Sequence, residues 1–413
     1  MLRVRQDFPS TVPFNIRAAL GIEFARLSSS IIPGARIAVG VGSRGITNLG
    51  VIVRSVLDLL RAAGANPFII PAMGSHGGAT PDGQRDILAG YGVTEEAMLV
   101  PILASLEVRQ IGESEDGVPV FCSTEALAAD GIVLINRVKP HTDFEGTLGS
   151  GLLKMCVIGL GKRAGATAMH IAASHLGYER VIRNMAKALL QGAPVLGGVA
   201  ILENQFHETA RLVVLRRDEM ETGEDSLLVE SRALMPLLPF EDIDLLIVDR
   251  LGKNISGAGM DPNVIGRGVQ GYIGALTRNG HSAPFIRRIF VRDLTPETHG
   301  NSIGIGLADV TTTRLVRAMD HRTTYINALT ALTPQSAKIP IYFDTDREAI
   351  ALTLASLAIA DIRAARVVRI TDTLNLSEIV ISEPLWIERE SGARLTAVSK
   401  VFEMEFDADD NLI

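Results

Sequence analysis

At 413 residues the chain is too long for one simple core, and 47% of its residues are hydrophobic, so we expect two globular domains without wholesale disorder. The net charge of −7 and an aromatic content of only 5% argue against nucleic acid as the main partner. No apolar run reaches the roughly 20 residues of a membrane helix, and no apolar signal segment follows the first residues. Two cysteines, Cys122 and Cys156, cannot form a disulfide framework. We therefore expect a cytoplasmic protein that makes no contact with a membrane.

The first half of the chain alternates apolar strands with amphipathic helices, which is typical of an α/β fold. Thr80 is expected to cap a helix that has Pro81 at its first position. One earlier helix is expected to bury a side formed by Val51, Val56, Leu59 and Leu60. In chain order, the expected elements are a helix over 14–29, a strand over 36–41, a helix over 49–63, and strands over 67–72 and 131–136.

Each of these three strands runs into a loop that carries a polar side chain. Arg44 follows the first strand, His76 lies between glycines after the second, and His141 follows the third. Ligands of open parallel sheets bind beyond the carboxyl ends of the strands. The sequence therefore predicts that these three side chains converge on one edge of a sheet.

The second half of the chain repeats the α/β pattern. We expect an N-terminal domain over 1–235 and a C-terminal domain over 236–413, each with a parallel-type sheet, and we expect the last residues to pack back on the first domain. An active-site cleft is expected between the two domains, a common place for a small molecule. The polar stretch near 216–231 is expected to be a linker or an excursion from the fold. The expected elements are a helix over 178–191, a strand over 194–202, strands over 243–249, 288–291 and 366–370, and helices over 310–319 and 346–361.

Several side chains in the first domain suit catalysis, each with a plainer alternative. His76 and His141 titrate near neutral pH and suit acid–base chemistry, although they could also cap a helix and bond a backbone carbonyl, respectively. Lys154 lies in an apolar stretch, where an amine is costly unless it is paired or modified; the alternative is a lysine that reaches solvent from a helix end. His170 alone is more typical of a core residue. Arg44 could hold a carboxylate through two hydrogen bonds, or could be a surface arginine.

Other familiar motifs are absent from the sequence. Gly159–Arg163 lacks the spacing of a Walker A loop, and Gly40–Gly42 lacks the third glycine of a dinucleotide fingerprint. Neither HExxH nor CxxC occurs, so the sequence does not support a self-contained zinc site.

Taken together, five short motifs resemble the nickel-pincer-nucleotide-dependent lactate racemase family, whose members isomerise 2-hydroxy acids. The resemblance covers the first half of the chain, whereas the second half is similar only as an α/β domain. The motifs are Gly-Ser-Arg at 42–44, Gly-Ser-His-Gly-Gly-Ala-Thr at 74–80, Lys-Pro-His at 139–141, Ser-Gly-Leu-Leu-Lys at 150–154, and His170, which lies 16 residues beyond Lys154.

The resemblance implies a role for each matching residue. The implied cofactor is nickel held by a pyridinium-3,5-bisthiocarboxylic acid mononucleotide, which is tethered covalently to Lys154. His170 would complete the square-planar nickel coordination, which two sulfurs, a ring carbon and an imidazole nitrogen suit. His76 and His141 would be the acid–base pair, one for each enantiomer of the substrate, and Arg44 would hold the substrate carboxylate. The resemblance also implies cofactor contacts from Lys139, Ser150 and Gly151.

The resemblance implies a racemase or epimerase that works through a 2-keto intermediate, but the substrate stays open. The family's racemases commonly carry an acidic residue three positions before the arginine, where this chain has Val41. Gly151–Leu152–Leu153 replaces a Gly-Gly of the family. Lys253, Asn254 and Asp261 are candidate substrate contacts from the second domain. Expected partners are a small 2-hydroxy acid, the enzymes that make and load the cofactor, and another copy of the chain in a homo-oligomer.

Two other hypotheses fit the same residues. One is a nickel-independent hydrolase or lyase that uses His76 and His141 as its acid–base pair. The other is a non-catalytic protein that binds or carries the nucleotide.

Overall fold

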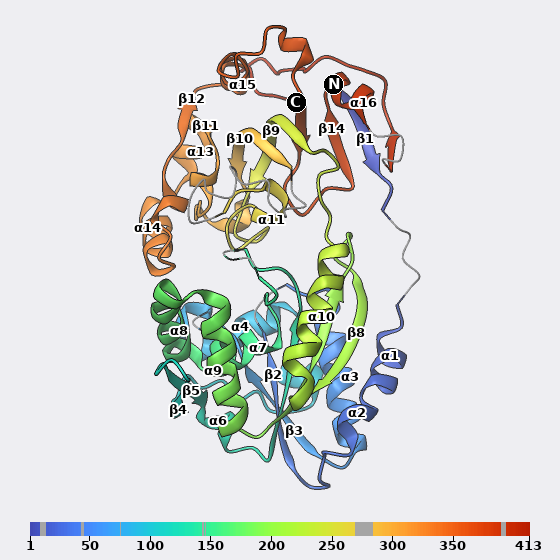
Figure 1. The fold of residues 1–413 in the computed structure, drawn as a ribbon, viewed down its shortest axis with the longest axis vertical. Helices are drawn as coiled ribbons and strands as arrows, with labels where there is room; N and C mark the ends of the chain where they lie inside the picture. The colour runs from blue at the N-terminus through green and yellow to red at the C-terminus, as the bar shows by residue number, and fades with distance from the viewer. Residues whose placement is uncertain are drawn as a thin grey trace. The chain divides into compact units, whose positions relative to one another are not determined.

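The computed structural model describes residues 1–8, 14–42, 45–74, 76–142, 144, 146–268, 284–389 and 394–413. The chain divides into two compact units, both of mixed α/β structure (Figure 1), which confirms the expected fold class. We call Thr11–Met235 the N-terminal unit, and Met1–Ser10 together with Pro236–Ile413 the C-terminal unit. A cleft between the two domains stays a prediction.

The N-terminal unit is built on a five-stranded sheet of order β3-β2-β6-β7-β8, in which only the last pair is antiparallel. Its strands are β2 (Arg36–Val41), β3 (Asn66–Pro71), β6 (Gly131–Arg137), β7 (Val195–Glu203) and β8 (Thr209–Arg216). A separate antiparallel hairpin consists of β4 (Val108–Glu113) and β5 (Pro119–Ser123). The three strands expected from the first half are thus neighbours in one parallel sheet.

Helices cover both faces of this sheet (Figure 1). Alternate side chains of β6 enter different cores: Ile132 and Leu134 pack with α8, α9 and α10, whereas Val133 and Ile135 pack with α1, α2 and α3. This alternation follows from the two-residue period of a strand that is buried on both faces. The helices are α1 (Ile16–Glu23), α2 (Ala25–Ser28), α3 (Leu49–Ala62), α4 (Pro81–Gly90), α5 (Glu95–Met98), α6 (Thr124–Leu127), α7 (Leu152–Lys154), α8 (Lys162–Leu176), α9 (Tyr178–Gly192) and α10 (Met220–Ala233). A π-helical segment, Met155–Leu160, joins α7 to the turn before α8.

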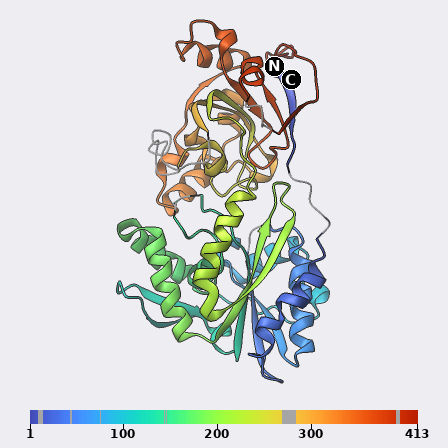
Figure 2. The same cartoon turned by 45° about the vertical axis from the view of Figure 1, so that its right-hand side comes forward.

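Two expectations for this unit are wrong. The stretch 216–231 is not a linker, because most of it forms α10, which runs alongside β7 and β8 (yellow-green in Figure 2). Met220, Leu227 and Leu228 recur at helical spacing on its buried side, so most of its polar residues lie on the outer face. Val51 is exposed on the outer side of α3, while Val56 and Leu60 are buried as expected.

The C-terminal unit is built on an eight-stranded sheet of order β12-β11-β10-β9-β13-β14-β1-β15. The five strands from β12 to β13 are parallel, and β14, β1 and β15 add antiparallel pairs. The strands are β1 (Leu2–Gln6), β9 (Asp242–Leu251), β10 (Phe285–Leu294), β11 (Val310–Thr312), β12 (Ile341–Phe343), β13 (Val367–Ile370), β14 (Glu378–Ile381) and β15 (Leu395–Ala397). The helices are α11 (Pro262–Ile265), α13 (Thr313–Ala318), α14 (His321–Thr330), α15 (Asp346–Ala355) and α16 (Glu383–Glu388).

The chain termini do not lie where the sequence suggested. Residues 1–10 were expected in the first domain, but β1 pairs with β14 and β15 in the C-terminal unit. The last residues were expected to pack on the first domain, but Leu412 packs in a core of the C-terminal unit. Two helix expectations also change: residues 310–312 form β11, and α15 ends at Ala355.

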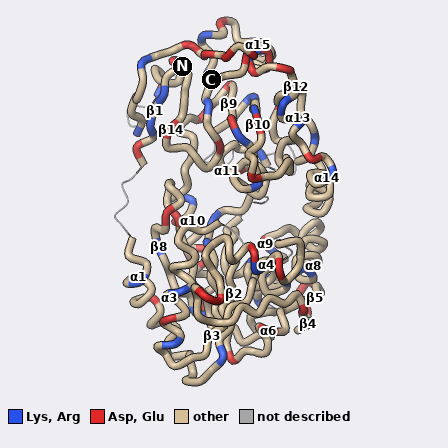
Figure 3. The backbone as a smooth tube through the Cα atoms, turned by 180° about the vertical axis from the view of Figure 1, so that it is seen from behind, with Lys and Arg blue, Asp and Glu red and all other residues tan. Residues whose placement is uncertain are grey.

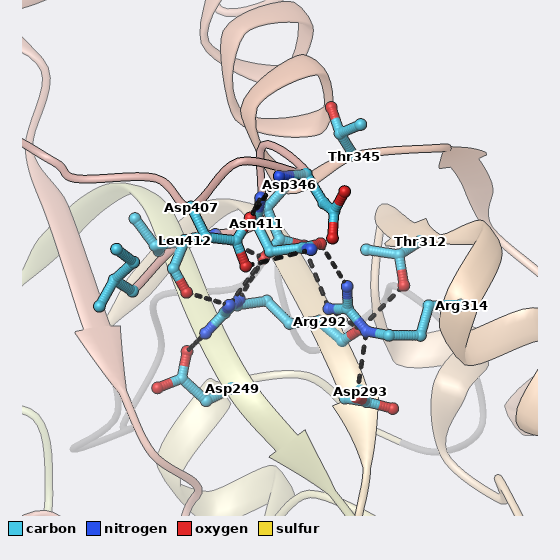
Figure 4. Close-up of polar contacts among 12 residues, drawn as sticks. Asp249, Arg292, Asp293, Thr312, Arg314, Thr345, Asp346, Asp407, Asn411 and Leu412 are labelled. Atoms are coloured by element: carbon cyan, nitrogen blue, oxygen red, sulfur yellow. Dashed lines mark hydrogen bonds and ion pairs between the residues drawn. The ribbon is translucent and has the colours of Figure 1, made fainter.

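A buried carboxylate holds the C-terminal segment to this sheet (Figure 4). Asp346, the first residue of α15, accepts hydrogen bonds from Arg292 Nε at 2.8 Å, Arg314 Nη2 at 3.3 Å and the backbone N–H of Leu412 at 3.0 Å. Arg292 also bonds Asp249 and the carbonyl of Leu412. The Asp346 side chain therefore joins the start of α15 to Leu412, which lies 66 residues later in the chain.

Charged residues of both signs are interspersed along the chain in both units (Figure 3). Within the described ranges, no helix is long and apolar enough to cross a membrane.

Candidate functional site

The candidate site is built on a loop that leaves the carboxyl end of β6 and returns as α7. Lys139 and Ser150 close this loop through two backbone hydrogen bonds, of 2.9 and 2.8 Å. Asn136, at the end of β6, donates its side-chain amide to the carbonyl of Gly151 at 3.0 Å. His141 lies within the closed loop, and Lys154 lies just beyond it. The pairing of Lys139 with Ser150 therefore brings the backbone around His141 close to the backbone around Lys154.

The two side chains do meet. Lys154 Nζ lies 2.5 Å from His141 Nε2, and both residues are half-buried. An amine and an imidazole at this distance are close enough for a hydrogen bond, so the charge of one affects the other. The loop thus brings together an amine and an imidazole from residues 13 positions apart, a contact that the sequence did not predict.

Aromatic rings connect this pair to His170. The His141 ring stacks on Phe144 with centroids 4.3 Å apart, and Phe144 lies nearly parallel to Tyr178 at 5.2 Å. His170, on α8, meets the edge of Tyr178 with centroids 6.0 Å apart. The rings form a continuous row in which Tyr178 separates the two histidines. His170 therefore lies in the same row of rings as His141.

His76 is held in its own loop after β3 by a buried amide. Gln84 of α4 donates its side-chain amide to the carbonyls of Gly74 at 3.0 Å and His76 at 3.3 Å. The buried Lys162 donates to the carbonyl of Pro71 and lies 3.4 Å from Gln84 Oε1. Because Lys162 begins α8, this chain of bonds ties the His76 loop to the helix that carries His170. The alternative that His76 caps the following helix is wrong, because Thr80 caps α4 and His76 only precedes a short 3₁₀ turn.

The helical run between Lys154 and His170 packs against the ends of β2 and β3. A Cβ on Gly42 would lie 3.5 Å from Met155 Sδ, and one on Gly74 would lie 2.8 Å from Ile158 Cγ2. The lack of a side chain at position 74, together with its φ of +62°, thus lets the two segments approach. His76, His141, Lys154 and His170 are therefore carried by segments that pack at one edge of the sheet.

One expected site residue remains untested. Arg44 lies outside the described residues, so its role stays a prediction.

The three candidate substrate contacts of the second domain make local contacts in this structure, and their role toward a substrate stays a prediction. Lys253 Nζ contacts Asn327 at 2.6 Å, Asn254 accepts from Thr295 at 2.6 Å, and Asp261 caps α11.

Neither cysteine is a nucleophile at neutral pH. Both are free and buried. Burial raises the pKa of the Cys122 thiol to about 12, and burial raises that of Cys156 well above its usual value. A thiol needs a lowered pKa to be reactive, so the imidazoles and the amine are the groups that can do chemistry here.

Comparisons with known proteins relate the first domain to a described family. Residues 11–179 match the family described as the lactate racemase N-terminal domain. This part of the chain is therefore similar to that domain. The matched residues include every candidate of the first domain, from Arg44 to His170. No curated protein matches the chain.

Solved structures show how far the likeness extends in space. The lactate racemase apoprotein from Thermoanaerobacterium thermosaccharolyticum is 12% identical, with a TM-score of 0.55 over 91% of this chain and 99% of that one. A protein from Thermotoga maritima, also 12% identical, has a TM-score of 0.49 over 78% of this chain and 81% of that one. At this identity the first likeness shows a shared two-domain α/β fold, and no more.

Sequence reasoning missed several residues that shape this site. Tyr178 and Phe144 give no motif, because their role depends on facing imidazoles from other segments. Glu224 was hidden in the presumed linker, although its spacing from buried neighbours on α10 indicates an inward position. Those neighbours are Met220, Leu227, Leu228 and Ser231.

Proposed function

We propose that this chain is a nickel-pincer-dependent isomerase, a racemase or epimerase of a 2-hydroxy acid. Lys154 would tether the cofactor, His170 would bind nickel, His76 and His141 would exchange protons with the substrate hydroxyl, and Arg44 would hold its carboxylate. The observation that carries the proposal is the 2.5 Å contact of Lys154 with His141 inside a domain matched to lactate racemase.

The residues present suit such a cofactor. Lys154 offers a primary amine, the group from which an amide or thioamide tether forms. This amine lies beside His141, the first ring of the row that continues through Phe144 and Tyr178. Tyr178 and Phe144 lie parallel within 5°, the arrangement that suits a flat aromatic ligand. Among the described residues, no three His, Cys, Asp or Glu side chains converge as a metal site, so a single imidazole such as His170 would need other ligands from the cofactor. When bound, the nickel-pincer group would supply a reversible hydride acceptor.

The contact between Lys154 and His141 also has a consequence for proton transfer. The untethered amine at 2.5 Å competes for the same imidazole nitrogen that a substrate hydroxyl would need. Acylation of Lys154 would replace the amine, which carries up to three N–H donors and a positive charge, by a neutral group with one N–H, so it would hold the lone pair of His141 less strongly. Tethering would thereby convert a closed basic pair into an available base, which contributes roughly 10²–10⁴-fold to a reaction. His76 would serve the opposite face of the substrate from its separate loop.

The tether is tested by mass spectrometry of the intact protein. Co-expression with the cofactor-making enzymes should give nickel and an added mass on Lys154, and Lys154→Ala should abolish both. Lys187→Ala removes an exposed lysine of α9 and should load like the wild type. Finding only the unmodified mass under these conditions would refute the tether.

Catalysis is tested separately, by exchange of the α-hydrogen of 2-hydroxy acids with the loaded protein. His141→Ala should keep the added mass and lose at least about 10²-fold of the exchange rate. Activity that survives Lys154→Ala would instead indicate a hydrolase or lyase without nickel. Full loading without exchange for any 2-hydroxy acid would indicate a cofactor-binding protein.

A further inference from the structure

Helix α7, which ends with Lys154, begins without a cap of its own. The residue before it is Gly151, whose lack of a side chain leaves the first N–H groups of the helix without a local acceptor. Glu224 supplies the acceptor from α10, some 70 residues later. Its Oε2 accepts a hydrogen bond from the backbone N–H of Leu153 at 3.0 Å, and the N–H of Leu152 also faces the carboxylate.

The carboxylate fits the space that the glycine leaves. A Cβ on Gly151 would lie 2.2 Å from Glu224 Oε1, so any larger residue would displace the acid. Glu224 is 0% exposed, and its Oε1 has no hydrogen-bond partner among the described residues. A wholly buried carboxyl with one unsatisfied oxygen costs stability, which makes a functional reason for keeping it more credible than a packing reason.

The same face of α10 also supports the other end of the loop. Ser231 donates to the carbonyl of Val138 at 2.9 Å, and Leu228 packs where a Cβ on Gly149 would come within 2.9 Å. Glu224, Leu228 and Ser231 thus follow one another along one stripe of the helix. Through them α10 holds both the segment that enters the loop with His141 and the segment that leaves it toward Lys154.

We propose that Glu224 is a positioning residue for Lys154: its carboxylate caps α7 from α10 and holds the Lys154 amine beside His141. The inference rests on the proposed role of Lys154 but concerns the protein without its cofactor. Glu224 acts through the backbone of Leu152 and Leu153, and not by touching a substrate.

The charge of Glu224 makes this support depend on pH. Burial raises the pKa of the carboxyl to about 7, against the opposing effect of the N–H groups of Leu153 and Leu152. Of the neighbouring charges, Asp225 on α10 raises this pKa further and Arg183 on α9 lowers it. Cys156 faces the carboxylate from the π-helical segment as a neutral thiol, because its own pKa is raised. The carboxylate form, which accepts the stronger hydrogen bonds, therefore prevails above neutral pH.

The test is trace acetylation of the cofactor-free full chain with acetic anhydride, at about pH 6 and about pH 8.5, on either side of the Glu224 transition. Peptide mass spectrometry measures labelling of Lys154 relative to the exposed Lys338. At the higher pH, Glu224→Gln should raise this ratio about threefold or more, because the neutral amide accepts weaker hydrogen bonds from the backbone of α7 and the amine loses its fixed position. At the lower pH the ratio should match the wild type, whose Glu224 is then neutral as well. Glu224→Ala should raise the ratio at both pH values.

Glu230→Gln is the matched control, since it neutralises a half-buried acid on the same helix that pairs with Arg211. It should label like the wild type throughout. Wild-type labelling of Lys154 in both Glu224 variants at both pH values would overturn the proposal. A parallel rise at the buried Lys162 would also overturn it, by showing general loosening of the fold. If Glu224→Ala does not fold, the pH dependence of the isosteric Glu224→Gln decides alone. Because the assay contains no cofactor, a missing adduct on Lys154 would refute the proposed function and leave this result standing.

Discussion

Single residues carry the chemistry of this site, and Lys162 shows how far one residue can depart from its usual behaviour. It is 1% exposed, has a φ of +52°, and donates only to neutral oxygens, those of Pro71 and Gln84. Burial lowers the pKa of its amine to about 8. Its positive φ and its buried amine both lower the stability of the fold. Lys162 nevertheless connects the His76 loop to α8 through these hydrogen bonds.

This burial predicts a specific pH dependence of stability. Between about 8 and 10.5 the unfolded chain binds the Lys162 proton while the folded chain does not, so folding becomes more favourable as the pH rises. Relative to Lys162→Met, the free energy of unfolding of the wild type should increase by roughly 3 kcal/mol across this window. Urea unfolding of both proteins at the two ends of the window, followed by circular dichroism, measures it. A constant difference between them would show that Lys162 is not a buried titrating amine.

At the residue scale, the sequence was most informative about reactive groups. His141, Lys154 and His76 were identified because imidazoles and an amine in glycine-rich or apolar surroundings are unusual. Their partners could not be identified in this way. Glu224 and Tyr178 are ordinary residues whose importance depends on what lies opposite them.

At the scale of elements, strands were easier to predict than the helix that supports the site. β2 and β6 were expected almost to the residue, because runs buried on both faces are continuously apolar. α10 was taken for a linker because most of its residues are polar, although an amphipathic helix needs only one apolar stripe.

The C-terminal segment offers an element-scale prediction, because one buried carboxylate holds it to the sheet. Asp346→Ala removes the acceptor of Arg292 Nε, Arg314 Nη2 and the Leu412 N–H. Losing one partner of a buried charge pair typically costs about 3–5 kcal/mol, so the C-terminal unit should unfold at lower urea. The single tryptophan, Trp386 in α16, reports on this unit by fluorescence.

Asp409→Ala is a suitable control, since Asp409 is exposed in the same segment. The free energy of unfolding measured by fluorescence should stay within about 0.5 kcal/mol of the wild-type value. An equally small effect of Asp346→Ala would show that the segment is held by apolar packing alone.

At the scale of the whole molecule, the first strand belongs to the last domain. β1 lies between β14 and β15, Leu2 and Val4 are buried in the C-terminal core, and Gln6 donates to the carbonyl of Leu376 at 2.7 Å. Removing residues 1–7 should therefore destabilise the C-terminal unit by on the order of 3–6 kcal/mol, from two buried side chains and their strand pairing. Trp386 fluorescence should report the loss.

Hydrogen exchange in the same truncated protein provides the contrast. Amides of β2 and β6, in the N-terminal unit, should keep their wild-type protection because they share no sheet with β1. Loss of protection in β2 and β6 together with an unchanged Trp386 transition would contradict this prediction. It would show that the first strand stabilises the N-terminal unit instead.

The sequence by itself determined the α/β class and the parallel strands that are followed by His76 and His141. Its motifs also singled out Lys154 and His170 as candidate site residues. These depend on local pattern: apolar runs, glycines at turns, and reactive side chains at fixed spacing. Only the tertiary structure decided that Lys154 meets His141, that Tyr178 connects them to His170, and that α10 caps α7. These are contacts between segments far apart in the chain, and loop closure and burial, not local preference, select them.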